Sequence, residues 1–501
     1  MQIMNQDTRE IEYEDAPQLP TKRTFFGHPW GLANLFGVEM WERFSFYGMQ
    51  GIVLFYMYYA VTDGGLGIDK TVAASIVGAY GGSVYVACII TAFISDKILG
   101  PERTLFYAAI IVMVGHIALA FIPGVAGLAV GFILIAIGSG GVKTCSQVLL
   151  GMLYSRRDPR RDGGFSIYYM GINIGAIGGP LITTYLWHAW GFHAGFGIAA
   201  VGMFFGLAQY VYTRKTSFGT IGSEVPNPLP ANQRIAVGVG FLAVVALFVL
   251  LVATGIVKVD WLSNIVTGVA FVAAVVLWCQ MYFSSLVSAK EKSRLLGFIP
   301  LFISGVLFFA IFDQQYTVLA IYSDFRLDRM VFGVEVPPSL IQAINPIFIV
   351  LLAGVFSAMW SKLGERQWST PVKFGVANII IGISLFFFIP FAGGAANSTP
   401  LVAVVWILFM FTIAELLLSP VGNSVTTKVS PVAFPTRMMA VWQMAVAMGV
   451  ALAGSLTTYY NPEDAGVERS FFLYLGIVSI VLGVALLAVS RWVVRKFVDV
   501  R

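Results

Sequence analysis

The chain has 501 residues, of which 58% are hydrophobic and only 11% are charged. A soluble globular protein carries about 25% charged residues, so this composition excludes an ordinary soluble domain. The formal net charge of +5 is spread over many loops and gives no reason to expect a nucleic-acid partner. Cys88, Cys145 and Cys279 are scattered through apolar segments, so neither a disulfide framework nor a zinc site is expected.

Long apolar blocks recur along the whole chain, and a helix that crosses a bilayer needs about 20 such residues. We therefore predict an all-α polytopic membrane protein. Residues 1–27 are polar and partly acidic, so no cleavable signal is expected there. Fourteen spans are predicted from hydrophobicity, near residues 30–61, 71–95, 104–122, 126–153, 164–188, 192–213, 234–256, 261–288, 297–323, 337–361, 371–392, 400–428, 436–459 and 468–494.

The distribution of lysine and arginine predicts the orientation. Of the 31 such residues, 24 fall in tails and loops on the side of the N-terminus and 5 in loops on the other side, while Arg43 and Lys143 lie inside spans. Cytoplasmic loops carry the excess of positive charge. An even number of spans places both ends of the chain on one side, so we predict a multi-pass protein of the inner (plasma) membrane with both termini in the cytoplasm.

Two short loops resemble each other. SDKILGPER, residues 95–103, follows the second span, and SKLGER, residues 361–366, follows the tenth. If the seventh and eighth spans are an insertion, these loops take equivalent places in two six-helix halves, which is typical of a duplicated transporter with its halves around a central cavity. Asp-Lys-x-x-Gly after the second helix also resembles the loop signature of the major facilitator superfamily.

This organisation divides the chain into five parts. They are a cytoplasmic tail at 1–27, a six-helix bundle at 28–215, a linker with two inserted transmembrane helices at 216–296, a second six-helix bundle at 297–496 and a cytoplasmic tail at 497–501.

Six charged residues lie deep inside the predicted spans, away from their ends, and each costs roughly 2.5–3.5 kcal/mol at the centre of a bilayer. They are Glu39, Glu42, Arg43, Lys143, Asp313 and Glu415. Residues four apart share one face of a helix, so Glu39 can pair with Arg43, and Tyr47 and Gln50 continue that stripe. Similar polar stripes are formed by Ser139, Lys143 and Gln147, by Tyr169 and Asn173, by Asp313, Tyr316 and Thr317, by Gln342 and Asn345, by Thr412, Glu415 and Ser419, and by Trp442 and Gln443. We expect these stripes to converge on a common interior.

Structural roles remain as alternatives for several of these residues. Glu39 and Arg43 could form only a pair within one helix, and Tyr47, Tyr169 and Trp442 could serve only in packing. Asn173 and Asn345 could join helices by hydrogen bonds. Lys143 and Glu415 have no opposite charge within their own helices, and this favours a functional role for both.

Three longer motifs occur in order along the chain. They are EMWERFSFYG at residues 39–48, YYMGINIG at 168–175 and AELLLSPVGNSVTTK at 414–428. These segments resemble the ExxERFxxYG, FYxxINxG and ELxxSPxGxSxxTK motifs of the proton-dependent oligopeptide transporters, a family of the major facilitator superfamily. DQQ at 313–315 and NP at 345–346 also fit, and two extra helices between the halves are usual in the bacterial members.

The resemblance implies a function and a set of roles. It implies a proton-coupled symporter that imports di- and tripeptides by alternating access, without catalytic residues, metal or cofactor other than protons. We also expect a monomer in the lipid bilayer. The implied proton-coupling residues are Glu39, Glu42, Arg43 and Asp313. The implied substrate-binding residues are Arg43, Tyr47, Tyr85, Lys143, Tyr169, Asn173, Asn345, Glu415, Ser419 and Trp442. The implied gating residues are Gln50, Asp313, Lys143 and Glu415. Within this scheme Arg43 and Lys143 draw the peptide's carboxylate, and Glu415 with the two asparagines receives its amino end.

Four departures from the family pattern bear on the expected roles: Phe46, Gln50, Thr144–Cys145 and Tyr316–Thr317. Phe46 replaces a tyrosine. Gln50 replaces an arginine that commonly pairs with the acid of the ninth span, here Asp313, so the ionic gate expected at that place is in doubt.

Three other functions compete with peptide import. A related porter could carry a modified amino acid or a peptidomimetic. A membrane-embedded enzyme would need a nucleophile with a base or a set of metal ligands, but none of the four histidines stands beside a motif serine or cysteine and no HExxH spacing occurs. A channel is disfavoured by the duplicated halves with their paired charges.

Overall fold

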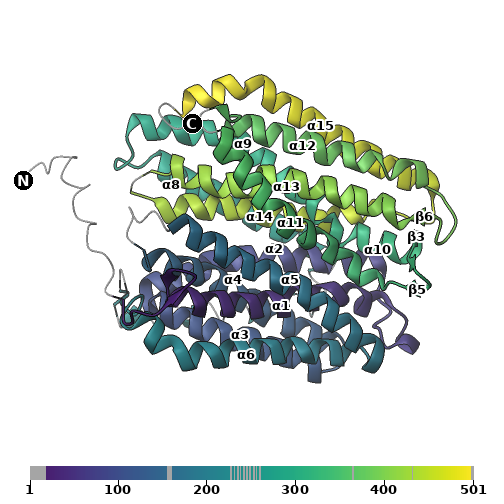
Figure 1. Ribbon diagram of the computed structural model, residues 1–501, viewed down its shortest axis with the longest axis horizontal. Helices are drawn as coiled ribbons and strands as arrows, with labels where there is room; N and C mark the ends of the chain where they lie inside the picture. The colour runs from purple at the N-terminus through teal and green to yellow at the C-terminus, as the bar shows by residue number, and fades with distance from the viewer. Residues whose placement is uncertain are drawn as a thin grey trace, which may run out of the picture. The chain divides into compact units, whose positions relative to one another are not determined.

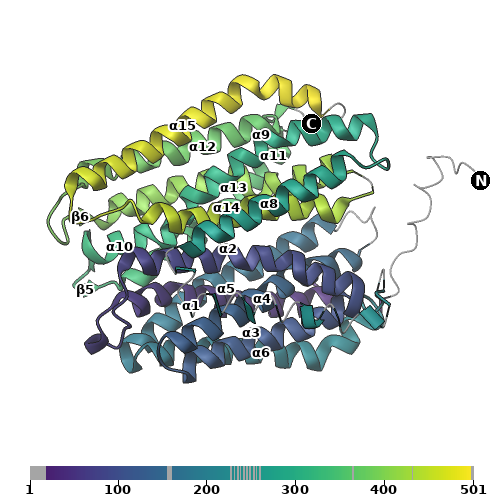
Figure 2. The ribbon, with the colours of Figure 1, turned by 180° about the vertical axis from the view of Figure 1, so that it is seen from behind.

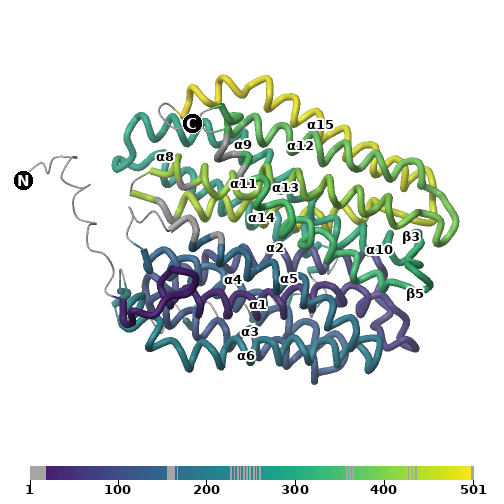
Figure 3. Tube along the Cα trace, in the orientation of Figure 1, coloured from purple at the N-terminus to yellow at the C-terminus, as the bar shows by residue number. Residues whose placement is uncertain are grey.

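The described part of the chain is mostly α-helical in the computed structural model (Figure 1), which confirms the predicted fold class. Described are residues 19–497 except 155–160, 226–227, 364–365, 432 and, between 231 and 260, residues 231, 234–235, 237, 241–242, 244–245, 248–249, 252–253, 255–256 and 259–260. Figure 3 traces the described residues in colour.

Long helices follow one another along the sequence. They are α1 (Gly31–Tyr58), α2 (Lys70–Ile94), α3 (Pro101–Phe121), α4 (Gly124–Met152), α5 (Arg161–Trp190), α6 (Phe192–Phe218), α8 (Leu262–Tyr282), α9 (Ala289–Phe312), α11 (Ile344–Leu363), α12 (Thr370–Phe386), α13 (Leu401–Val429), α14 (Pro435–Thr457) and α15 (Ala465–Lys496). Among the described residues, 11 helical segments are long and apolar enough to cross a membrane. The seventh predicted span, 234–256, falls largely outside the described residues.

Short elements complete the described chain. The helix α10 covers Val318–Phe325, and a π-helical turn at Ser95–Leu99 ends α2 within the predicted 95–103 loop. Three two-stranded pairs lie in the loops: β1 (Thr24–Phe25) with β2 (His28–Pro29), β3 (Leu327–Asp328) with β6 (Thr399–Pro400), and β4 (Met330–Val331) with β5 (Val334–Glu335). The first and third pairs are antiparallel and the second is parallel.

Glycine makes the reversal between α5 and α6 possible. Gly191 alone joins the two helices and has a φ of 87°, a left-handed conformation that glycine adopts without steric cost. Its N–H donates to the carbonyl oxygen of Trp187 over 2.7 Å, which satisfies one of the carbonyls left open where a helix ends.

Contacts between residues divide the chain into two compact units. The first unit comprises Met1–Met49, Ala87–Thr183 and His193–Val245, and the second comprises Gln50–Val86, Thr184–Phe192 and Ala246–Arg501. The two units therefore differ from the two sequence halves, because the later part of α1, the earlier part of α2 and the end of α5 group with the C-terminal helices. The predicted duplication of six-helix halves stays a proposal.

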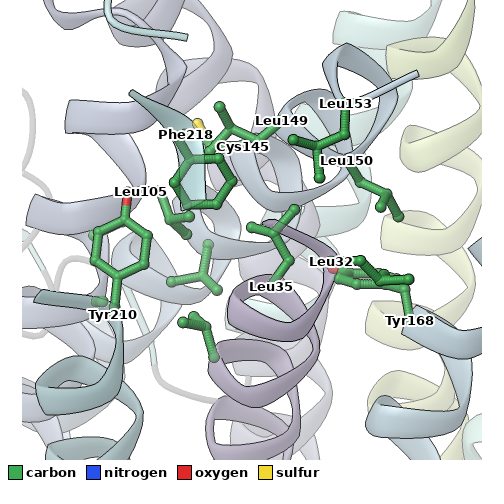
Figure 4. Close-up of a cluster of buried hydrophobic side chains, with 14 of the residues drawn as sticks. Leu32, Leu35, Leu105, Cys145, Leu149, Leu150, Leu153, Tyr168, Tyr210 and Phe218 are labelled. Carbon is green, nitrogen blue, oxygen red and sulfur yellow. The ribbon is translucent and has the colours of Figure 1, made fainter. Parts of the chain in front are cut away.

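The first unit is held together by apolar side chains and by close helix contacts. Its core cluster contains residues of α1, α3, α4, α5 and α6, including Leu35, Leu149 and Tyr210 (Figure 4). On α4, a Cβ at Gly138 would lie 2.7 Å from the carbonyl oxygen of Ala108 on α3. Only glycine fits at that distance, so α3 and α4 pack backbone to backbone.

In the second unit, glycines also allow two helices to pack backbone to backbone. The helices α12 and α15 run side by side (Figures 1 and 2). A Cβ at Gly375 would lie 2.9 Å from the carbonyl oxygen of Gly483, and one at Gly382 would lie 2.8 Å from that of Gly476. Small residues at helix interfaces are typical of membrane bundles, where helices associate through close van der Waals contact.

Polar and glycine contacts explain why parts of α1 and α2 belong to the second unit. The hydroxyls of Tyr58 and Tyr59 donate to the carboxylate of Asp324 on α10, over 2.6 and 3.1 Å. A Cβ at Gly78 on α2 would lie 2.6 Å from the Cα of Gly454 on α14. We call the contact of Gly78 with Gly454 the α2–α14 seam.

The helix α8, which also belongs to the second unit, lies next to this seam. The hydroxyl of Ser263 donates to the carbonyl oxygen of Ser75 on α2. A Cβ at Gly454 on α14 would lie 2.8 Å from the Ser263 hydroxyl oxygen. The same serine therefore touches α2 and α14, so α8 is fixed to both helices of the seam.

The ninth predicted span differs from the structure at both ends. The helix α9 begins at Ala289, well before the expected residue 297, because its first turns are charged and hydropathy does not detect them. Ser288 caps this helix in a capping box with Glu291. The span is also interrupted, since a 3-10 turn at Asp313–Tyr316 separates α9 from α10.

Gln314 satisfies the backbone at this interruption. Its side-chain Nε2 donates to the carbonyl oxygens of Ala310, over 3.1 Å, and of Ala453 on α14, over 3.3 Å. Its Oε1 accepts from the hydroxyls of Thr317, over 3.0 Å, and Thr457, over 3.4 Å. Lipid offers no hydrogen-bond partner to freed backbone groups, so broken helices need such internal substitutes.

We expect Gln314→Leu to lower the stability of the fold. The substitution removes the Gln314 hydrogen bonds to the Ala310 carbonyl and the Thr317 hydroxyl, and an unsatisfied buried group costs about 1–3 kcal/mol. Ala453 and Thr457 keep the hydrogen bond that joins them, over 2.8 Å. The midpoint of thermal unfolding in detergent should fall, with a loss of about 2 kcal/mol in the free energy of unfolding. Gln280→Leu, at an exposed position of α8, is the control, and an equal fall in both variants would contradict the role of Gln314.

Candidate functional site

The charged residues of α1 form one buried ion-pair cluster in the first unit. Glu39 and Glu42 have 0% of their surface exposed, and Arg43 has 5%. The Nε atom of Arg43 lies 2.9 Å from Oε1 of Glu39 and 3.1 Å from Oε2 of Glu42. The predicted pair of Glu39 with Arg43 is therefore present, and Glu42 shares the same guanidinium. We call these three residues the α1 cluster.

Hydroxyl groups from two neighbouring helices hold the other carboxylate oxygens. The Tyr168 hydroxyl on α5 donates to Oε2 of Glu39 over 2.7 Å, and the Ser146 hydroxyl on α4 lies 3.1 Å from the same oxygen. The Ser139 hydroxyl, also on α4, donates to Oε1 of Glu42 over 2.6 Å. Each carboxylate thus has one oxygen on arginine and one on a hydroxyl, so a net charge of −1 is stabilised in a buried place.

A close approach of two helices makes this arrangement possible. A Cβ at Gly175 on α5 would lie 2.2 Å from the carbonyl oxygen of Met40 on α1. No other residue fits there. Because α5 lies so close to α1, Tyr168, two turns before Gly175, reaches Glu39 directly.

Other predicted residues of the first unit lie around the α1 cluster. Lys143 on α4 is half-buried and interacts electrostatically with Arg43 and with both glutamates of the cluster. Tyr47 is half-buried and interacts electrostatically with Arg43. Asn173 is buried, and its Nδ2 donates to the carbonyl oxygen of Tyr169 over 2.9 Å. The Tyr169 side chain is 39% exposed.

The second unit holds a separate acidic cluster. The Nδ2 atom of Asn345, at the start of α11, donates to the Thr412 hydroxyl over 3.0 Å and to Oε2 of Glu415 over 3.3 Å. Asp313 is near enough to repel the Glu415 carboxylate. Ser419, one turn after Glu415 on α13, is half-buried, and its hydroxyl has no hydrogen-bond partner among the described residues. Glu415 with Asn345 and Thr412 is called the α13 cluster below.

Trp442 on α14 packs against α13 in the interior of the second unit. Its side chain is 1% exposed, and its ring lies 5.9–6.2 Å from the rings of Phe298, Phe309 and Phe374. A Cβ at Gly422 on α13 would lie 2.2 Å from the Trp442 ring. This environment is that of a core residue, which was the structural alternative for Trp442, and its role in substrate binding stays a prediction.

The last predicted residues lie in the second unit. Gln50 is buried, and its Oε1 has no hydrogen-bond partner among the described residues. Tyr85 on α2 is half-buried, and so is Asp313. In the first unit Gln147, which was part of the predicted polar stripe, is exposed, while the neighbouring Ser146 contacts Glu39 of the α1 cluster.

Two residues of the site were missed in the sequence. Ser146 lies seven residues after Ser139 and three after Lys143, so helical spacing alone puts all three on one face of α4. Tyr168 begins the second motif, directly before the predicted Tyr169, but no pattern in its own helix marked its hydroxyl as a partner of an acid on α1.

The comparisons with known proteins identify the family. The family model described as POT family matches residues 102–471.

The chain belongs to the POT family.

Curated relatives of the POT protein cover nearly its whole length. The transporter YclF of Bacillus subtilis is 40% identical over 97% of this chain and 98% of its own. A di-/tripeptide transporter of Lactococcus lactis is 38% identical over 96% of this chain and 99% of its own. A crystal structure of a POT family transporter in complex with 5-aminolevulinic acid matches with a TM-score of 0.89 and 36% identity, over 94% of this chain and 98% of that one.

Family membership settles one of the competing functions and the type of fold. The POT protein is a multi-pass membrane transporter of the family that the three motifs resembled, so the alternative of a membrane-embedded enzyme is wrong. The same finding confirms the major facilitator type of fold predicted from the paired loops.

Proposed function

We propose that the protein is a proton-coupled symporter that imports di- and tripeptides by alternating access, and that protons are its coupling ion. The observation that carries the proposal is the α1 cluster, in which two buried carboxylates share one guanidinium. A structural ion pair needs only one acid, and the second acid adds a negative charge to the cluster that Lys143 on α4 faces.

The cluster can link proton binding to peptide binding. With both acids ionised, Arg43 is held by two carboxylates. Protonation of either acid leaves one carboxylate on the arginine and frees part of its charge for the carboxylate of a peptide. Each binding event then favours the other by the same factor, since coupling between two sites is reciprocal.

A zwitterionic peptide also needs partners at both ends. Arg43 and Lys143 supply positive charge in the first unit, and Glu415 with Asn345 supplies a negative, hydrogen-bonding group in the second unit. Asn173, Tyr47, Tyr85, Tyr169 and Ser419 complete the proposed set. The proposed roles need no side-chain-specific pocket, which suits a carrier of many different peptides.

The energy of one proton is sufficient for accumulation. Each pH unit supplies about 1.4 kcal/mol per proton, and each 100 mV supplies about 2.3 kcal/mol per charge. Together they support roughly a hundred- to a thousandfold concentration of peptide, because 1.4 kcal/mol corresponds to a factor of ten.

Reconstitution tests the proposal directly. Purified protein in proteoliposomes should accumulate a labelled dipeptide when the outside is made acidic or the inside negative. A protonophore should abolish the accumulation, while exchange of labelled for unlabelled dipeptide at equal pH should continue. Uptake that depends on neither gradient would contradict proton coupling. The absence of any dipeptide exchange would contradict the proposal that dipeptides are substrates.

A second candidate cargo is a modified amino acid with peptide-like poles. The relative solved with 5-aminolevulinic acid bears on this candidate, because that ligand has an amine at one end and a carboxylate at the other, as a dipeptide has. Competition decides between the two: if 5-aminolevulinic acid displaces a labelled substrate at far lower concentration than dipeptides or tripeptides do, the peptide proposal is wrong.

The gating residues give a separate prediction. Gln50→Arg should restore an ion pair with Asp313 and so favour one conformation over the other, measured as changed accessibility of an introduced cysteine from the two sides of the membrane. The double variant Gln50→Arg/Asp313→Asn should lose the effect. If the single and double variants behave alike, the two positions do not interact. Lys143 and Glu415, the other proposed gating residues, remain unchanged in both variants.

We further propose the predicted orientation, an inner-membrane protein with both termini in the cytoplasm, and a monomeric state. The excess of lysine and arginine on one side supports the orientation.

A further inference from the structure

We propose that Tyr168 is a positioning residue for proton coupling. Its hydroxyl, supported by that of Ser146, holds Glu39 in the ionised, Arg43-paired form and thereby sets the pH at which the α1 cluster takes up a proton. This inference rests on the proposed proton-coupled transport. In the FYxxINxG motif that this segment resembles, the first residue is phenylalanine, so the Tyr168 hydroxyl distinguishes this chain from the pattern.

The distances favour one arrangement of the hydrogen bonds, in which Tyr168 is the donor to Glu39. The oxygens of Ser146 and Tyr168 are 2.6 Å apart, and the Tyr168 oxygen is 2.7 Å from Oε2 of Glu39. The contact of Ser146 with Glu39 is longer, at 3.1 Å. Two hydroxyl protons serve these three contacts, and the shortest path is a chain in which Ser146 donates to Tyr168 and Tyr168 donates to Glu39. Hydrogen bonds in such a chain polarise and strengthen one another.

Donation to Glu39 favours its charged form. A hydroxyl can serve a protonated carboxyl as well, but a hydrogen bond to an ionised acceptor is about twice as strong as a neutral one. Loss of the donor therefore weakens the ionised form more than the protonated form, and the proton binds at a higher pH.

The surroundings hold the Tyr168 hydroxyl in place and leave no access for a water molecule that could replace it. Glu39, Ser146 and Tyr168 are all buried, and the Tyr168 ring lies in the apolar core cluster with Leu32 and Leu150 (Figure 4). A phenylalanine keeps these ring contacts and removes only the hydroxyl.

Other charged or titratable groups act on the same site and stay in place in such a variant. Among the described residues they are Glu42, Arg43 and Tyr47 from α1, Cys88 from α2, and Lys143 from α4. Arg43 and Lys143 favour an ionised Glu39, and Glu42 opposes it. Because none of these groups changes in the variant, a shift in the pH dependence of uptake can be assigned to the loss of the Tyr168 hydroxyl.

The chain offers a matched control. Tyr210 on α6 belongs to the same core cluster, and its hydroxyl lies 3.0 Å from Oε1 of Glu102. Glu102 is also paired with an arginine, since Nε of Arg214 is 2.8 Å from Oε1. Tyr210→Phe therefore removes a buried hydroxyl that donates to an ion-paired acid, and this acid lies outside the α1 cluster.

The test uses full-length protein in proteoliposomes with a fixed internal pH. The initial rate of labelled dipeptide uptake is measured against external pH for the unaltered protein, Tyr168→Phe, Ser146→Ala and Tyr210→Phe. We expect the midpoint of the profile to move to higher pH by about one unit in Tyr168→Phe, the effect of losing one charge-assisted hydrogen bond. Ser146→Ala should shift it in the same direction, Tyr210→Phe should not shift it, and exchange at equal pH should persist in Tyr168→Phe.

The outcomes separate this inference from the proposed function. If the unaltered protein shows no proton-driven uptake, the proposed function fails and this inference fails with it. If driven uptake is present but Tyr168→Phe leaves the midpoint unchanged, or Tyr210→Phe shifts it equally, only the role of Tyr168 is overturned. Should Tyr168→Phe fail to fold, the midpoint of Ser146→Ala decides by the same criterion.

Discussion

Glu39→Gln is expected to abolish the accumulation of dipeptide driven by a proton gradient while leaving exchange at equal pH. Glutamine cannot take up the proton, so the α1 cluster stays in one charge state and the gradient has no group to act on. Exchange needs no net movement of protons and should continue. Glu42→Gln should behave in the same way if either acid is required. Both modes are measured in one preparation of proteoliposomes, and accumulation should fall to the level of empty vesicles.

Glu102→Gln is the control for this experiment. Glu102 is a buried acid of the same unit, with its carboxylate on Arg214 and Tyr210, and it lies outside the α1 cluster. It should lower thermal stability without a selective loss of the driven mode. Full accumulation in the Glu39→Gln and Glu42→Gln variants would remove the cluster from coupling. Equal loss of both modes together with stability would show that the cluster only fastens α1 to its neighbours.

Glu415→Gln should weaken the binding of peptides that have a free amino end by roughly ten- to a hundredfold, because a hydrogen bond to a charged group contributes about 1.5–3 kcal/mol. The α13 cluster offers this carboxylate together with the Asn345 amide. An N-acetylated dipeptide has no ammonium group and should lose much less. Affinities of both ligands are measured by calorimetry on the purified variants.

Glu468→Gln serves as the comparison within the second unit. Glu468 is fully buried, and its Oε2 lies 3.3 Å from Nη2 of Arg326 and accepts from the N–H of Gly393 over 2.8 Å. Its loss should affect folding and leave the ratio between the two ligands unchanged. Equal weakening of the free and the acetylated dipeptide in Glu415→Gln would exclude Glu415 from the amino-end role.

Much of the fold followed from hydropathy, because in a bilayer one physical requirement, an apolar helix of sufficient length, governs each span. Hydropathy averaged over a window misplaced a helix end and missed an interruption where individual polar side chains determine the structure. The charged start of α9 belongs to the helix although it is not apolar, and the interruption at residues 313–317 depends on Gln314, whose four partners include residues of α14 remote in sequence.

The site was predictable where its residues share one helix. The spacing of Glu39 and Arg43 predicted their pair, and the intramembrane charge of Lys143 and Glu415 marked them as exceptional. The partnership of Tyr168 with Glu39 was not predictable, because it depends on how closely α5 approaches α1 at Gly175. For Trp442 the sequence left two roles open, and the structure places its ring among the aromatic side chains of the packed core, while its role in substrate binding stays a prediction.

The α2–α14 seam has a consequence for the way the protein changes shape. Two glycines meet there without side chains, so the contact is made by dispersion forces between backbones, which lose a quarter to a half of their strength over a gap of about 0.5–1 Å. Such a contact resists small displacements and offers almost no resistance to large ones. If transport separates α2 from α14, the seam should therefore be either closed or open, with few positions between. The hydrogen bond of Ser263 on α8 to Ser75 on α2 then has to be re-formed only if α8 moves away together with α14.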